Sequence, residues 1–395
     1  MSSGFGGTTG IIDAAGGSLG DTAGGSAGDS AGGAAGGSAV ASDVRAVRGF
    51  TDAEGVHAVV FATPGSSTIT ELTGTPLGNS VDLGGNPMAR STPWGYRRHD
   101  GPAVIAYVDT NGHIHERGTL DFDFALSFGI NAPIASGPPA DPAVPTPDVI
   151  GYVRSDNQSA LVYRASNNHV IEVRSNFSGQ PPWLATDLTS ASGARVTATT
   201  GSAFPYVRSD GWNAIVYIAS DNHIHELTSL GSGWQDADLS AAAGDTVVPI
   251  TDPSGYRRSD GGNSVVYVGN DLEIHDLTAF PGRSSWSSSI LPAVSPLGGI
   301  IRRPSGYARV DGLNAVVYVS GSTTNQSVHE LVLGSNGWTD AALPAPSASS
   351  IVQPFGHQAS GGRSSVLFQA TDAQGAVSRY ELSLPLGGSW GLQAF

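Results

Sequence analysis

Seven copies of a unit of about fifty residues occupy most of this chain. The units begin near Gly49, Gly95, Gly151, Pro205, Gly255, Gly306 and Gly356. Successive starting points lie 46, 56, 54, 50, 51 and 50 residues apart. Such a period indicates a repeat architecture, in which each unit buries its apolar faces against its neighbours.

The clearest unit, residues 205–240, shows what one copy contains. A β-branched run, NAIVYIA, is followed by an Asp-Asn turn, a second run, HIHEL, and a Trp-led segment, WQDADLS. This pattern predicts four short antiparallel strands, which is the content of a propeller blade. The strand that contains VVY is apolar on both faces, as expected between neighbouring blades. We therefore predict an all-β fold, a seven-bladed β-propeller of four-stranded antiparallel blades over residues 41–395.

The first forty residues have a different composition. Gly, Ala, Ser and Asp dominate residues 1–40, which cannot bury enough apolar surface to offset the entropy of ordering. We predict a disordered, low-complexity N-terminal tail that is either a tether or dispensable. The segment has neither the basic start nor the apolar stretch of a secretory signal. We accordingly expect a cytoplasmic protein, or one exported by an unconventional route.

Charge and cysteine content exclude several classes of function. The chain has 19 basic residues, all arginine, against 34 acidic residues, and its net charge is −15. This balance argues against nucleic acid as a partner. No apolar run reaches the roughly 20 residues of a membrane helix, so membrane insertion is not expected. The absence of cysteine excludes thiolate metal sites and cysteine nucleophiles.

Polar or aromatic side chains recur at four fixed places in the unit. An acid follows the third-strand apolar residue in every copy: Glu71, Glu116, Glu172, Glu226, Asp276, Glu330 and Glu381. Five copies place an arginine in a GYxR-like segment: Arg98, Arg154, Arg208, Arg258 and Arg309. Two residues later each of these has an aspartate: Asp100, Asp156, Asp210, Asp260 and Asp311. Five copies begin the outer strand with tryptophan: Trp183, Trp234, Trp286, Trp338 and Trp390.

Two interpretations of these residues remain open. A carboxylate that accepts sugar hydroxyls, a guanidinium that donates to them and an indole that stacks on a sugar face together make a carbohydrate site. The alternative is structural: the arginine and the aspartate two residues later form one buried ion pair per blade, the third-strand acid pairs with the arginine of a neighbouring blade, and tryptophan covers the outer edge. Under that alternative the propeller is a protein-interaction scaffold, and its arginines and acids are mutually paired and buried.

Metal and enzyme functions are not expected from the sequence. His223 and His225 lie two residues apart and share a strand face, but Glu273 replaces the first histidine in blade 5 and Ile171 the second in blade 3. A metal site needs a third ligand, and none is evident, so no metal or cofactor is predicted. Catalysis requires one asymmetric constellation, whereas these polar residues repeat, which leaves a glycosidase as the lesser alternative.

The chain resembles the fungal fucose-specific lectin family and related bacterial propeller lectins over about residues 45–395. The resemblance is carried by Ile215-Val216-Tyr217, by Ile224-His225-Glu226 and by Trp234. It implies that the third-strand acids bind sugar hydroxyls, with Asp276 as a shortened substitute, and that an aromatic ring packs on the sugar. The family's arginine just before VY is not present, and we hypothesise that the GYxR arginine replaces it. We predict a non-enzymatic, multivalent lectin that recognises glycans, fucosylated ones among them, through repeated sites between blades.

Overall fold

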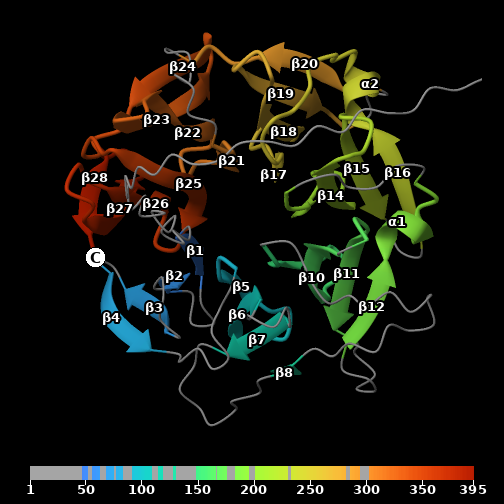
Figure 1. The fold of residues 1–395 in the computed structure, drawn as a ribbon, viewed down its shortest axis with the longest axis horizontal. Helices are drawn as coiled ribbons and strands as arrows, with labels where there is room; N and C mark the ends of the chain where they lie inside the picture. The colour runs from blue at the N-terminus through green and yellow to red at the C-terminus, as the bar shows by residue number, and fades with distance from the viewer. Residues whose placement is uncertain are drawn as a thin grey trace, which may run out of the picture. The chain divides into compact units, whose positions relative to one another are not determined.

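The computed structural model is a β-propeller of seven four-stranded antiparallel sheets arranged in a ring (Figure 1). It describes residues 47–51, 56–62, 68–74, 77–82, 91–108, 114–118, 128–129, 148–165, 167–175, 183–194, 201–229, 233–281, 285–293 and 302–395. Each sheet is formed by four strands that follow one another in the chain. The predicted all-β, seven-bladed propeller is therefore confirmed, while the tail predicted over residues 1–40 lies outside the described residues.

The first four blades contain the following strands. Blade 1 has β1 (Arg48–Thr51), β2 (His57–Ala62), β3 (Ile69–Gly74) and β4 (Leu77–Asp82). Blade 2 has β5 (Trp94–Arg97), β6 (Ala103–Val108), β7 (Ile114–Gly118) and β8 (Phe128–Gly129). Blade 3 has β9 (Ile150–Val153), β10 (Ser159–Arg164), β11 (Val170–Ser175) and β12 (Trp183–Asp187). Blade 4 has β13 (Phe204–Val207), β14 (Asn213–Ile218), β15 (Ile224–Ser229) and β16 (Trp234–Asp238).

The remaining three blades follow the same order. Blade 5 has β17 (Ser254–Arg257), β18 (Asn263–Val268), β19 (Ile274–Ala279) and β20 (Ser287–Ile290). Blade 6 has β21 (Ser305–Ala308), β22 (Asn314–Ser322), β23 (Asn325–Gly334) and β24 (Gly337–Ala342). Blade 7 has β25 (Ser350–Ala359), β26 (Arg363–Thr371), β27 (Val377–Pro385) and β28 (Gly391–Ala394).

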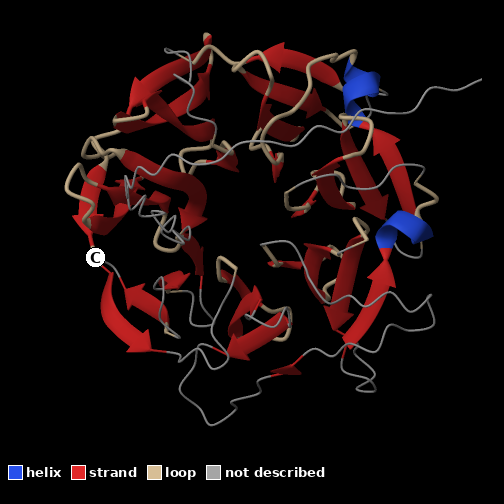
Figure 2. Ribbon diagram, viewed as in Figure 1, coloured by secondary structure: helices blue, strands red, loops and turns tan. Residues whose placement is uncertain are grey.

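Within the described ranges, two short helices interrupt the strand pattern (Figure 2). Helix α1 (Leu188–Ala191) follows β12, and helix α2 (Leu239–Ala243) follows β16. Asp187 and Asp238 cap their N-termini by accepting backbone N–H groups, as acidic N-cap residues do. The sequence analysis took all of WQDADLS as strand, but the strand ends at the capping aspartate. No helix in the described part of the chain is long and apolar enough to cross a membrane.

The ring is closed through the first strand of each sheet. Each first strand contacts the first strand of the next blade, and β25 of blade 7 contacts β1 of blade 1. The Gly-Tyr pair of the repeat makes this approach possible, because a Cβ added to Gly306 would lie 2.2 Å from the Tyr256 ring of the preceding blade. At the closure, Gly49 leaves the corresponding space for His357. Each glycine thus accommodates the aromatic ring of the blade before it.

The second strands form the core of each blade. All six residues of β14 are buried, and Tyr217 is only 1% exposed. Strands β2, β6, β10 and β18 are buried in the same way along their whole length. Burial on both faces explains why these segments are runs of β-branched residues instead of alternating apolar and polar ones.

Asparagines at the start of the second strands join neighbouring blades. Asn263 of blade 5 accepts the backbone N–H of Ser209 in blade 4 at 2.7 Å. Asn314 of blade 6 accepts the N–H of Ser259 in blade 5 at 2.8 Å. Both asparagines are buried, so the Gly-x-Asn segment supplies an inter-blade hydrogen bond as well as a turn.

Aromatic side chains from well-separated blades meet inside the ring. The Trp94 ring of blade 2 contacts Phe204 of blade 4 and Phe355 of blade 7, with centroid distances of 5.9 and 5.4 Å. The buried Arg48 guanidinium lies 5.4 Å from the Trp94 centroid and 5.3 Å from that of Phe355. Apolar packing and a cation–π contact therefore join the inner strands across the ring.

Candidate functional site

In blade 4 the predicted arginine and acid meet in one cluster, in which the acid is buried and the arginine partly exposed. Tyr206 lies in β13, Arg208 directly follows that strand, and Glu226 lies in β15. Tyr206 donates its hydroxyl hydrogen to Glu226 Oε1 at 2.6 Å, and Arg208 Nη1 donates to Oε2 at 2.7 Å. Glu226 is 1% exposed. Both carboxylate oxygens therefore already have a donor within their own blade.

This acid–arginine cluster recurs in three other blades. The Arg Nη1 to Glu oxygen distances are 2.7 Å for Arg98–Glu116, 2.7 Å for Arg154–Glu172 and 3.0 Å for Arg309–Glu330. A tyrosine hydroxyl also donates to each glutamate: Tyr96, Tyr152 and Tyr307. The repeat thus builds one polar group of tyrosine, arginine and glutamate in each of blades 2, 3, 4 and 6.

Blade 5 departs from this pattern because its acid is shorter. Asp276 lies 3.6 Å from Arg258 Nη1, and it accepts a hydrogen bond from the Ser264 hydroxyl. In blade 7 the equivalent Glu381 accepts from Ser365 and lies 3.0 Å from His57 of blade 1. The acid is buried in all these blades, but the basic side chain beside it is arginine in some blades and histidine in blade 7.

The aspartate two residues after each arginine occupies the solvent side of the cluster. Arg208 Nη2 donates to Asp210 at 2.9 Å, and equivalent pairs join Arg98 to Asp100 and Arg309 to Asp311. The aspartate side chains are 26–46% exposed across the five blades. The sequence analysis considered a buried Arg–Asp pair, but the buried partner of the arginine is the third-strand glutamate or aspartate.

Burial and the neighbouring arginine shift the pKa values of the two kinds of acid in opposite directions. Burial raises the pKa of Glu226, although the charge of Arg208 and the hydrogen bond from Tyr206 act against that shift. At Asp100, burial is outweighed by the hydrogen bond and charge of Arg98, so its pKa is lowered. The arginine therefore stabilises a carboxylate inside the protein and holds a second one at the surface.

The predicted tryptophans lie against the cluster of the preceding blade. The Arg154 guanidinium of blade 3 lies 5.6 Å from the ring centre of Trp234 in blade 4. Arg208 of blade 4 lies 5.8 Å from that of Trp286 in blade 5. The next blade therefore completes each arginine's surroundings with an indole face.

The other tryptophans differ in what they contact in the preceding blade. The side chain of Trp390 in blade 7 lies beside Glu330 of blade 6 and acts to lower the pKa of that acid. Trp338 of blade 6 packs against a buried cluster that includes Tyr256 of blade 5. Trp183 begins β12, and its side chain lies outside what the structure describes. Three tryptophans therefore contact the acid–arginine cluster of the preceding blade directly.

The sequence analysis missed the tyrosine of each cluster. Tyr96, Tyr152, Tyr206, Tyr256 and Tyr307 recur two residues before the arginine, a signal that was present in the GYxR pattern. A buried tyrosine hydroxyl requires a hydrogen-bond partner, and the third-strand glutamate supplies it in four blades. The repeated tyrosine was visible in the sequence, but the hydrogen-bond partner of its hydroxyl depends on how the first three strands of the blade align.

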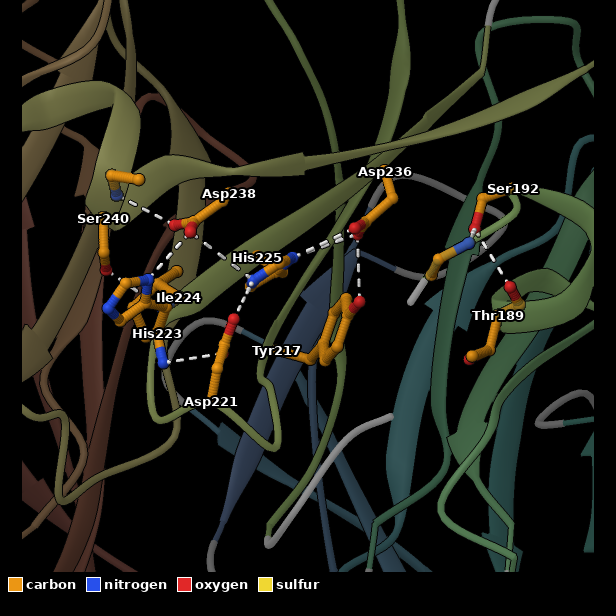
Figure 3. A network of polar contacts seen from close by, with 12 residues as sticks. Thr189, Ser192, Tyr217, Asp221, His223, Ile224, His225, Asp236, Asp238 and Ser240 are labelled. Atoms are coloured by element: carbon orange, nitrogen blue, oxygen red, sulfur yellow. Dashed lines mark hydrogen bonds and ion pairs between the residues drawn. The ribbon is translucent and has the colours of Figure 1, made fainter. Parts of the chain in front are cut away.

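The histidines of the HIHE segment belong to a different cluster (Figure 3). The His225 ring packs against Tyr217 in a tilted arrangement, with 5.8 Å between the ring centroids, and lies next to Asp221 and Asp236. His223 Nδ1 lies 2.7 Å from the capping Asp238. Carboxylates from a turn and from the outer strand thus surround the histidine pair, which sequence spacing alone did not reveal.

The comparison with known proteins identifies a fold. No model of a known protein family matches the sequence, and no curated protein sequence matches it. Among solved structures, the chain is similar to the BP39L lectin from Burkholderia pseudomallei, with a TM-score of 0.61 and 11% identity over 88% of this chain and 98% of that one. The likeness is one of fold. It agrees with the expected resemblance to propeller lectins.

Fungal lectins also match, at lower structural similarity. AofleA from Arthrobotrys oligospora has a TM-score of 0.48 and 13% identity, over 78% of this chain and 86% of that one. A six-bladed lectin from Aleuria aurantia has a TM-score of 0.43 and 14% identity, over 76% and 93% of the two chains.

Proposed function

We propose that this chain is a multivalent carbohydrate-binding lectin with sites between neighbouring blades. The observation that carries the proposal is the placement of Arg208 beside Trp286 of the next blade, at 5.8 Å. A sugar presents hydroxyls along its edge and C–H groups on its face, which suit a guanidinium fork and an indole. Known propeller lectins of the same fold add support, since BP39L is itself described as a lectin.

Within such a site the glutamate orients the arginine. Both oxygens of Glu226 accept hydrogen bonds from Tyr206 and Arg208, and the side chain is almost fully buried. Sugar hydroxyls would therefore meet the remaining N–H groups of Arg208 and the partly exposed Asp210. This assignment modifies the role that the family resemblance implies for the acid.

The five arginine side chains differ in their solvent exposure. Arg98, Arg208 and Arg309 are 13–18% exposed, whereas Arg154 is 0% and Arg258 6% exposed. We expect the sites of blades 2, 4 and 6 to bind most strongly. Individually weak sites on one ring gain through avidity on a glycan-coated surface. The sequence resemblance makes fucosylated glycans the first class to test.

A glycan array with the purified protein tests the proposal. A triple variant, Arg98→Lys, Arg208→Lys and Arg309→Lys, keeps a positive charge beside each buried glutamate but removes the fork. We expect it to fold and to lose about tenfold or more in avidity. Lysine substitutions of the exposed Arg97 and Arg257, each adjacent to a site arginine, are the matched controls. No binding by the wild-type protein across a broad array would overturn the proposal.

The second candidate is a non-catalytic protein-interaction scaffold. The pairing of Arg208 with the buried Glu226 is what that hypothesis expects. Under it, the wild-type protein and the triple variant both fail to bind glycans, and the triple variant differs from the wild-type protein only in stability. The array and a denaturation curve for the same two proteins therefore separate the candidates.

A further inference from the structure

A second polar cluster occupies the face of blade 4 opposite the acid–arginine cluster. His225 and Glu226 are consecutive in β15, so their side chains point to opposite faces of the sheet. Asp238 lies directly across from His225 in β16, and Asp221 lies in the turn between β14 and β15. Figure 3 shows these carboxylates around the His225 imidazole.

Three potential ligand atoms converge in this cluster. His225 Nε2 lies 3.1 Å from Asp221 Oδ2 and 3.9 Å from Asp238 Oδ2. The ligand atoms of the three residues all lie within 4.8 Å of one another. Ligands bound to zinc at about 2.0–2.2 Å in a tetrahedron lie about 3.3–3.6 Å apart, so only a small contraction is needed.

The other nitrogen of His225 is already held in place. His225 Nδ1 lies 3.1 Å from Asp236, and Tyr217 donates to the same carboxylate at 3.0 Å. The imidazole also packs against the Tyr217 ring and is 6% exposed. Metal-binding histidines commonly have such a carboxylate on the second nitrogen, which fixes the ring and directs the first nitrogen at the ion.

Each of the two aspartates is anchored by one oxygen and presents the other. Asp221 Oδ1 accepts the backbone N–H of His223 at 3.1 Å, while Oδ2 faces His225. Asp238 Oδ1 accepts the backbone N–H of Ala241 at 2.8 Å, while Oδ2 faces His223 and His225. The second oxygens, which lie against the histidine ring nitrogens, are therefore held toward the imidazole before any ion arrives.

The charge balance of the cluster favours a cation. Asp221, Asp236 and Asp238 form ion pairs only with histidines among the described residues. The side chains of Asp221 and Asp238 are 36% and 29% exposed, so an ion has access from solvent and can retain water ligands. No arginine pairs with these three aspartates among the described residues, and a divalent cation would supply positive charge to them.

Equivalent positions in the neighbouring blades lack one of the three ligands. In blade 5, His275 Nε2 lies 3.0 Å from Asp271, but Ile290 stands across from His275 in the outer strand. In blade 3, Ile171 stands across from Asp187. We propose that blade 4 binds one zinc-type divalent cation through Asp221, His225 and Asp238, with water completing the coordination.

Calorimetric titration of the full-length protein with ZnCl₂ tests this site. Asp221→Asn removes the ligand charge and keeps the turn acceptor, while Asp271→Asn makes the same change in blade 5. We expect the wild-type protein and D271N to bind one ion per chain, and D221N to bind about tenfold or more weakly. Cobalt(II) should likewise give a visible ligand-field absorption with the wild-type protein and D271N but not with D221N.

A second variant covers the possibility that D221N folds poorly. Asp238→Asn retains a helix-capping side chain and should weaken zinc binding to a similar extent. Zinc should raise the thermal midpoint of the wild-type protein and D271N more than that of either blade 4 variant. Absence of saturable zinc binding, or equal losses in D221N and D271N, would overturn the proposal.

Discussion

Arg208 of blade 4 lies 2.7 Å from Glu226 of its own blade and 5.8 Å from the ring centre of Trp286 in the next. The arginine therefore links the first and third strands of one blade and faces the outer strand of another. This offset accounts for a mismatch in the sequence, where the arginine is found in blades 2–6 and the tryptophan in blades 3–7. When each arginine is matched to the tryptophan of the next blade, the five arginines and the five tryptophans form five pairs.

Removal of the charge on Glu226 is expected to destabilise the fold. Glu226→Gln keeps the side-chain volume but leaves Arg208 without its buried counter-charge. We expect the free energy of unfolding to fall by about 2–3 kcal/mol. Urea denaturation of the wild-type protein and the variant measures this difference in unfolding free energy. Asp210→Asn, at the exposed end of the same arginine, should cost about 1 kcal/mol or less. Equal stability of E226Q and the wild-type protein would contradict the structural role of the pair.

The contact between blades 4 and 5 depends on one asparagine. Asn263→Ala leaves the Ser209 N–H without the acceptor that it has at 2.7 Å. Because the site is buried, we expect a loss of about 1–3 kcal/mol in unfolding free energy. Asn270→Ala, in the exposed turn of blade 5, is the control and should change stability by less than about 0.5 kcal/mol. Thermal denaturation of both variants provides the comparison.

The sequence predicted the blades well because their signal is local. The run that contains Tyr217 is β-branched and flanked by turn residues, so its strand follows from neighbouring residues alone. The seven copies repeat that information, which also determines the number of blades. The partners of Arg208 and Trp286 could not be predicted in this way. A repeat shows which residues recur, but ring geometry decides which neighbouring blade each one faces.

Two local signals in the same stretch were available and were not used. Asp238 precedes Leu-Ser-Ala-Ala-Ala-Gly, an arrangement typical of a short helix with an acidic N-cap and a glycine C-cap. The segment that contains Asp221 was interpreted as an ordinary Asp-Asn turn. Their approach to His225 depends on the pairing of β15 with β16, which brings turn and outer strand together. Long-range register, not composition, limited the prediction of this cluster.

The glycine of the Gly-Tyr pair has a steric role that a single methyl group can test. Gly306→Ala would place a Cβ 2.2 Å from the buried Tyr256 ring of the preceding blade. We expect a loss of about 1–3 kcal/mol in unfolding free energy through overpacking. Gly233→Ala is the control, because nothing lies near the added methyl there and the change should be close to neutral. If G306A is as stable as the wild-type protein, blades 5 and 6 accommodate the added methyl group without a cost in unfolding free energy.

His357 should make the closure of the ring sensitive to pH. Its ring lies 5.6 Å from Phe355 and 5.3 Å from His57 of blade 1, and neither ring nitrogen has a hydrogen-bond partner among the described residues. Burial lowers the pKa of His357 well below its ordinary value of 6.5. Below pH 6.5 the unfolded chain therefore binds a proton that the folded protein does not, and stability falls.

The contribution of His357 can be isolated by a variant that does not titrate. His357→Phe keeps an aromatic ring, and Phe50 occupies the equivalent position in blade 1. As the pH falls from 8 to 5.5, the wild-type protein should lose up to about 1.4 kcal/mol per pH unit below 6.5 relative to H357F. Urea denaturation of both proteins across this range measures the difference, in which the other titrating groups cancel. Parallel stability curves would show that the His357 pKa is the same in the folded and unfolded states.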